Sequence, residues 1–184
     1  MIKLGDYVVT PTIFPDGTSQ VWKIPEEILN TASMVTWEFE NESELSSIIQ
    51  LSALIAVSTG RQPSLTMPYL IYGRQDKEIS NTTTFAKGVI ISMLLKHYNK
   101  IITLDQHSSD GLYYRANIIS AQPNLRDVLI AVKPDVICYP DLGASNRGYD
   151  KYFYPVVILD KVRDQLTGEI TGLVLLPPRS HISS

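Results

Sequence analysis

Two polar loops of this chain carry residue types that could do chemistry. Their charged and amide side chains belong to Arg74, Gln75, Asp76, Lys77, Asp105, Gln106, His107 and Asp110. Each loop follows an apolar stretch of strand-like composition, and ligands of open parallel sheets bind outside the carboxyl ends of strands. A guanidinium fork matches phosphate oxygens, and carboxylates suit Mg²⁺. The two loops therefore predict a joint site for an anion and a metal, with phosphate and magnesium as the natural pair.

Strand and helix patterns alternate along the chain in units of about 30 residues. One helix is predicted over 45–60, opened by a capping-box pattern at 41–44 and closed by Gly60, and two more over 83–98 and 123–132. Predicted strands cover 7–10, 19–24, 34–39, 64–71, 100–104, 135–139, 156–159 and 172–176. This alternation predicts an α/β fold with a parallel sheet flanked by helices.

The composition narrows the classes of function. The net charge of −3 gives no reason to expect nucleic acid, which calls for clustered Lys and Arg. No stretch approaches the ~20 apolar residues of a membrane span, and the N-terminus lacks the apolar core of a signal peptide, so we expect a cytoplasmic protein. The single cysteine, Cys138, excludes a disulfide framework and a Cys-based zinc site. Its apolar neighbours predict a small buried side chain.

Four blocks of residues resemble motifs of the ribose-phosphate pyrophosphokinase (PRPP synthetase) family, in the same order. Residues 14–17 are similar to its Phe-x-Asp-Gly-Glu flap, and 68–76 to its Pro-Tyr-x-x-Tyr-Ala-Arg-Gln-Asp-Arg nucleotide loop. Residues 105–107 resemble its Asp-Leu-His metal motif. Residues 140–143, with 160–163 beyond them, resemble the opening of its second domain. Arg-Gln-Asp after Pro-Tyr is the most specific piece of this resemblance.

The resemblance implies both a fold and a reaction. The expected fold is phosphoribosyltransferase-like, with an N-terminal domain over 1–140 and an incomplete second domain of the same type over 141–184. The implied reaction transfers the β,γ-diphosphate of Mg-ATP to the C1 hydroxyl of ribose 5-phosphate, or of a derivative such as ADP-ribose, giving PRPP and AMP. Such transfer depends mainly on positioning and on neutralising charge.

The resemblance also implies roles for single residues. ATP would be held by Phe14, Asp16, Arg74, Gln75 and Asp76. His107 would ligate Mg²⁺ with Asp105 nearby, and Asp141 would orient a metal or the ribose phosphate. Lys161 and Arg163 would be catalytic, closing on the transferring diphosphate. In this family the flap receives adenine across a subunit boundary, so a homo-oligomer is expected.

Departures from the family pattern leave alternatives open. Thr18 stands where the family has Glu, and the family's PRPP loop, which would follow Leu176, is not found in these 184 residues. We therefore expect negligible PRPP synthesis by this chain alone. A gene cut short, a split enzyme and a noncatalytic nucleotide-binding relative all fit this pattern. Taken singly, Arg74 to Asp76 also fit a solvated turn, Asp105 a helix cap and His107 a surface residue.

Overall fold

The computed structural model divides into two compact units, residues 1–123 and 124–184, which are described separately. The predicted domain boundary between residues 140 and 141 falls inside the second unit and stays a prediction. The described residues are 1–76, 80–108, 117–121, 125–146, 154–164 and 169–176.

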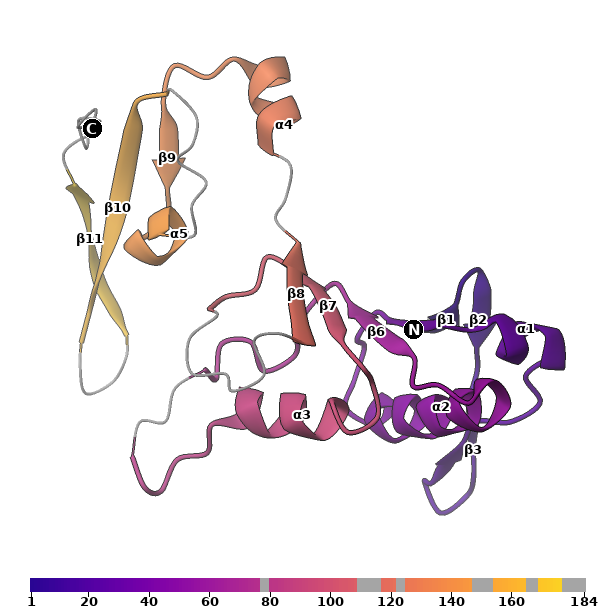
Figure 1. Cartoon of the computed structure of the whole chain (residues 1–184). Helices are drawn as coiled ribbons and strands as arrows, with labels where there is room; N and C mark the ends of the chain where they lie inside the picture. The colour runs from indigo at the N-terminus through magenta and orange to yellow at the C-terminus, as the bar shows by residue number, and fades with distance from the viewer. Residues whose placement is uncertain (77–79, 109–116, 122–124, 147–153, 165–168, 177–184) are drawn as a thin grey trace. The chain divides into compact units, whose positions relative to one another are not determined.

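The first unit is built on a six-stranded, mainly parallel sheet (Figure 1). Its strand order is β2-β1-β5-β6-β7-β8, and β5 to β8 run parallel, whereas β1 is antiparallel to both of its neighbours. The strands are β1 (Ile2–Leu4), β2 (Tyr7–Val9), β5 (Met34–Trp37), β6 (Ser64–Met67), β7 (Ile101–Leu104) and β8 (Ile118–Ala121). The predicted α/β fold with a parallel sheet is confirmed.

Helices α2 (Glu44–Thr59) and α3 (Ala86–Leu94) lie along one face of this sheet (Figure 1), and α1 (Glu26–Thr31) packs against α2. Alternate strand residues and one stripe of each helix form the core between them. Its fully buried side chains include Val35, Trp37, Ile48, Leu51, Leu65, Met67, Ile91, Leu94 and Ile101. No described helix has both the length and the hydropathy needed to cross a bilayer.

Helix α2 ends as predicted but begins differently. Gly60 has a left-handed φ of 70°, and its N–H donates to Ala56 O, which closes the last turn. The capping box predicted at 41–44 is formed only in part: Oδ1 of Asn41 accepts the Ser43 N–H at 3.0 Å and the Ser43 hydroxyl, whereas the N-cap of the helix is Ser43, which makes no side-chain cap. The carboxylate of Glu44 accepts from partners before the helix, which outcompete the reciprocal bond of a capping box.

Several boundaries also differ from the sequence expectation. The strand predicted over 19–24 is only β4 (Ser19–Gln20), which forms a hairpin with β3 (Thr12–Ile13). The helix predicted over 83–98 shortens to α3, and β8 was not predicted. Cys138 is exposed, so the expectation of a buried side chain is wrong.

The second unit holds a three-stranded sheet in the order β11-β10-β9. Strands β9 (Ile137–Tyr139) and β10 (Val156–Arg163) are parallel, and β11 (Ile170–Leu176) runs antiparallel to β10. The unit also contains the helices α4 (Leu125–Val132) and α5 (Leu142–Asn146).

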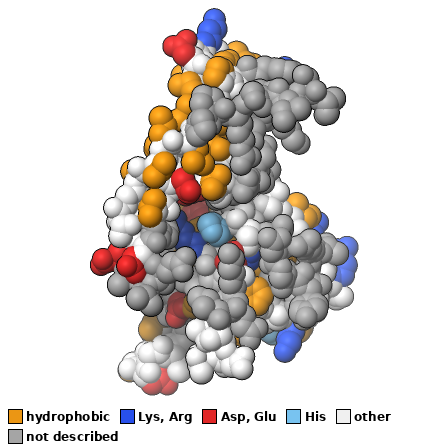
Figure 2. Space-filling view, turned by 90° about the vertical axis from the view of Figure 1, so that its left-hand side faces the viewer, with side chains coloured by type: hydrophobic (Ala, Val, Ile, Leu, Met, Phe, Trp, Pro, Cys, Tyr) orange, Lys and Arg blue, Asp and Glu red, His pale blue; other side chains and the backbone are white. Residues whose placement is uncertain are grey.

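The second unit buries few apolar side chains, and Figure 2 shows hydrophobic side chains gathered on its surface. Those at least 45% exposed include Val128, Ile130, Val132, Val162, Ile170, Leu173, Val174 and Leu175.

Candidate functional site

The two polar loops begin side by side at the carboxyl edge of the parallel sheet. Strand β6 ends at Met67 and β7 at Leu104, and the Leu104 N–H donates to Pro68 O at 3.2 Å. Asp105 then takes a left-handed φ of 47°, a conformation that Asp adopts more readily than most residues, and its N–H donates to Ala121 O at 2.8 Å. The predicted meeting of the two loops is therefore present within the first unit.

The first loop presents Arg74 and Gln75 to solvent. Tyr72 has a φ of 57°, which is rare for a bulky residue, and the Gln75 N–H donates back to Tyr72 O at 2.9 Å. Both Arg74 and Gln75 are exposed. Within the described residues, the Arg74 guanidinium has no carboxylate within 4.0 Å. This loop therefore holds an exposed cation that can accept an anionic ligand.

A hydrogen bond joins the first loop to the second. The Ser108 hydroxyl donates to Oδ2 of Asp76, and the Gln106 side chain donates to the Ser108 carbonyl oxygen. The Gln106 N–H donates to Oγ of Ser120 at 2.9 Å, which anchors the second loop to β8. Lys87 from α3 also contacts Ser108. Sequence reasoning gave no role to Lys87 or Ser108, and named Gln106 only among the polar side chains of the second loop.

The predicted metal residues of the second loop lie at its start. Asp105 is half-buried and His107 is exposed. Across the described part of the chain, no group of three or more His, Cys, Asp or Glu side chains is arranged to hold a metal ion. Mg²⁺ is usually held by one or two carboxylates together with substrate phosphates and water. Asp105 offers one such carboxylate, and His107 lies two residues further along the same loop.

The predicted adenine flap lies in the β3–β4 hairpin, which projects from the α2 side of the unit and does not approach α3 (Figure 1). Phe14 packs edge-on against Trp22 at 6.5 Å between ring centroids. Oδ1 of Asp16 accepts the Thr18 hydroxyl at 2.7 Å and the Thr18 N–H at 3.0 Å, and these bonds lower the pKa of Asp16. Among the described residues, no hydrogen bond, ion pair or ring contact joins Phe14 or Asp16 to Arg74.

The predicted residues of the second unit form a pair. The Lys161 ammonium lies 2.8 Å from Oδ2 of Asp141, and Oδ1 of Asp141 accepts the Ala144 N–H at 2.7 Å in the first turn of α5. Arg163 ends β10, where the register with β11 is irregular, and its side chain lies outside the described residues. The structure therefore joins Asp141 to Lys161, two residues that the sequence assigned to different roles.

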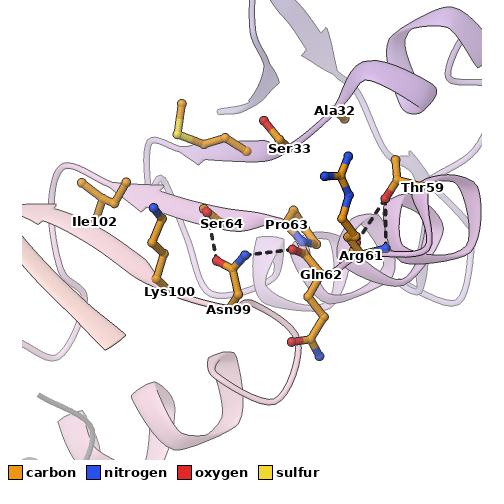
Figure 3. Close-up of a pocket in the computed structure, with 11 residues that line it drawn as sticks. Ala32, Ser33, Thr59, Arg61, Gln62, Pro63, Ser64, Asn99, Lys100 and Ile102 are labelled. Carbon is orange, nitrogen blue, oxygen red and sulfur yellow. Dashed lines mark hydrogen bonds between the residues drawn. The ribbon is translucent and has the colours of Figure 1, made fainter. Parts of the chain in front are cut away.

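A groove of about 390 Å³ lies at the opposite edge of the sheet, before strands β5, β6 and β7 (Figure 3). Polar groups of this groove are hydrogen-bonded to one another and stabilise the fold: Ser64 donates to Asn99, and Asn99 donates to Gln62 O. Arg61 directly follows α2, where the negative end of the helix dipole favours a cation. The same dipole disfavours an anionic ligand here. The groove is therefore a poor candidate for the predicted phosphate site.

Comparison with known proteins finds relatives among curated proteins and solved structures, three of which are given below. The chain is 23% identical over 168 residues to the ribose-phosphate pyrophosphokinase of Saccharolobus solfataricus, covering 86% of the chain and 57% of that protein. It is 24% identical over 136 residues to ribose-phosphate pyrophosphokinase 2 of Archaeoglobus fulgidus, covering 73% of the chain and 46% of that protein. The crystal structure of phosphoribosylpyrophosphate synthetase from Mycobacterium smegmatis matches the fold with a TM-score of 0.64 and 15% identity, over 95% of this chain and 60% of that one.

These matches confirm the resemblance that the sequence motifs predicted. The chain spans about half the length of the two archaeal relatives. No protein-family model matches it.

Proposed function

We propose that this chain, a divergent relative of the ribose-phosphate pyrophosphokinases, supplies the ATP- and metal-binding side of a diphosphate-transfer site. The reaction moves the diphosphate of Mg-ATP to ribose 5-phosphate or a derivative of it. The observation that carries the proposal is the hydrogen bond between Ser108 and Asp76. It joins the Arg74–Asp76 loop to the Asp105–His107 loop at the sheet edge where ligands of parallel sheets bind.

The exposed groups of this edge suit a nucleotide triphosphate. Arg74 can offer two parallel N–H donors to phosphate oxygens, and Gln75 adds an amide. Asp105 and His107 would hold Mg²⁺, which supplies positive charge to the phosphates when it is bound. Stabilisation of charge on the transferring group is the main catalytic need in phosphoryl chemistry.

The second unit would act on the diphosphate. By resemblance to the family, Lys161 and Arg163 would be its catalytic cations, and Asp141 would orient a metal or the ribose phosphate. The ion pair in this structure keeps the Lys161 ammonium bound to Asp141. Engagement of the diphosphate would replace this carboxylate partner with phosphate oxygens.

The β3–β4 hairpin supports an expected homo-oligomer. Phe14 packs against Trp22 and Asp16 accepts from Thr18, and neither contact is with the two loops of their own chain, so we expect the flap to receive the adenine of a nucleotide bound by a neighbouring subunit. Thr18, which stands where the family has Glu, fixes the Asp16 carboxylate through two hydrogen bonds. In this chain Asp16 would therefore be the acidic group of the flap.

Two measurements test the proposal. Calorimetric titration with Mg-ATP should show binding, and His107→Ala should weaken the dependence of that binding on Mg²⁺. Incubation with Mg-ATP and ribose 5-phosphate then reports transfer through matched release of AMP and PRPP. Binding without AMP release would assign the chain to noncatalytic nucleotide-binding relatives. A chain that binds no Mg-ATP would overturn the proposal altogether.

A further inference from the structure

Lys87 is a fully buried lysine that contacts both loops of the site. Its ammonium donates to the Ser108 carbonyl oxygen and lies 3.4 Å from Oγ of Ser108. Its backbone N–H donates to Gln75 O at 3.2 Å. One residue of α3 therefore binds the first loop through its backbone and the second loop through its side chain. The Ser108 hydroxyl, which donates to Asp76, closes a ring of hydrogen bonds through all three segments.

A fully buried lysine is unfavourable for the stability of the fold. Taking an ammonium group out of water is costly, and an apolar side chain of similar size would avoid that cost. Lys87 is also the second residue of α3, where the positive end of the helix dipole disfavours a cation. Residues that break local rules in this way concentrate at functional sites.

We infer that Lys87 is a positioning residue for the nucleotide and metal site, an inference that rests on the proposed function. Its bonds fix the spacing between the loop of Arg74 and Asp76 and the loop of Asp105 and His107. Mg-ATP bridges the two loops, so a fixed spacing lowers the conformational entropy lost on binding. Without the ammonium, the second loop would lose its bond to α3, and only the Ser108–Asp76 and Leu104–Pro68 hydrogen bonds would hold the two loops together before ligand binds.

The test replaces Lys87 with a side chain of similar length. Lys87→Met should raise the Kd for Mg-ATP at least tenfold while the protein stays folded by circular dichroism. The matched control is Lys96→Met, an exposed lysine just beyond the same helix, which should leave the Kd unchanged. Hydrogen exchange without ligand should become faster in peptides covering 70–76 and 104–108 together, and should stay unchanged in β5 and β6. A normal Kd in folded Lys87→Met would overturn the inference, as would unchanged exchange.

A second variant keeps the test decisive if Lys87→Met does not fold. Ser108→Ala removes the bond to Asp76 and keeps the carbonyl that accepts from Lys87, so it should raise the Kd at least threefold. Where Lys87→Met does fold, the two effects should combine in the double variant to less than their product, because both act on one ring of bonds. Full multiplication would overturn the inference. If the parent chain binds no Mg-ATP, the proposed function fails, and the exchange measurement alone still supports or overturns the linkage.

Discussion

The carboxylate of Asp141 joins Lys161 of β10 to the first turn of α5 in the second unit. Oδ2 lies 2.8 Å from the Lys161 ammonium, and Oδ1 accepts the Ala144 N–H at 2.7 Å. The first bond ties α5 to β10, and the second stabilises the first turn of the helix. Asp141 therefore has a structural role that must be separated from any role in binding.

Asp141→Ala should destabilise the second unit by about 0.5–2 kcal/mol, the usual cost of losing a capping side chain. Hydrogen exchange in α5 and β10 measures this locally, which is needed because a chain of two units has no single free energy of unfolding. Asp160→Ala, in the same strand as Lys161, is the matched control. Equal effects of the two variants would contradict the capping role.

Lys161→Met should change that stability by less than about 1 kcal/mol, because partly exposed ion pairs contribute little. The same substitution should abolish release of AMP and PRPP if the proposed transfer occurs. The two measurements together separate a catalytic cation from a structural one. A large loss of exchange protection in Lys161→Met would assign the lysine to the fold.

The first unit should lose stability in mild acid because of Glu44. Burial raises the pKa of this carboxyl. Hydrogen bonds from the Glu40 N–H, the Trp37 indole and the Met1 ammonium lower the pKa by more than burial raises it, so the net pKa lies below 4.5. The unfolded chain then binds the proton first. The stabilisation is complete above pH 4.5 and is lost as the pH falls through the lower folded pKa.

Glu44→Gln should therefore cost about 1.5–3 kcal/mol at neutral pH, the range for hydrogen bonds to a charged group. It should also flatten the fall in stability below pH 4.5. The exposed Glu42→Gln is the control and should change neither quantity. Amide exchange in α2 and β5, followed across pH, measures both. An unchanged pH dependence in Glu44→Gln would contradict the assignment.

The second unit should open more readily than the first. Its β11 residues Leu173 and Leu175 are more than 60% exposed, whereas Leu65 and Ile101 of the first sheet are fully buried. Buried apolar surface is the main source of stability, so amides of β10 and β11 should exchange faster than those of β6 and β7. Equal protection in the two sheets would contradict this expectation.

The sequence predicted the features that depend on local pattern. Runs of β-branched and aliphatic residues located β5, β6 and β7, and loop order placed Arg74 and His107 at one edge. The features that it missed depend on distant partners. The Glu44 carboxylate does not make the expected capping bond, because it accepts hydrogen bonds from Trp37 and Met1. Lys87 is buried because its ammonium binds Ser108 of the second loop.

The other two differences from the sequence prediction, the exposure of Cys138 and the presence of β8, depend on neighbouring elements of the fold. Cys138 lies in an apolar run, yet it is exposed because nothing described covers its face of the second sheet. Strand β8 is only four residues long and pairs with β7, a partner separated from it by the second loop. Neither outcome is decided by the residues of the segment itself.

Arg74 should be the residue to which Mg-ATP binding is most sensitive. A charge-assisted hydrogen bond contributes about 1.5–3 kcal/mol, and about 1.4 kcal/mol corresponds to a tenfold change in Kd. Arg74→Ala should therefore raise the Kd tenfold or more. The matched control is Arg61→Ala, since Arg61 is also exposed but lines the groove at the opposite edge of the sheet.

Ionic strength provides a second readout for the same pair of variants. Salt screens exposed charges, so binding by the parent should weaken as salt rises, and the gap between the parent and Arg74→Ala should narrow. Arg61→Ala should follow the parent at every salt concentration. Equal weakening by both substitutions would mean that Mg-ATP responds to the overall charge of the protein and is not bound at the loop of Arg74.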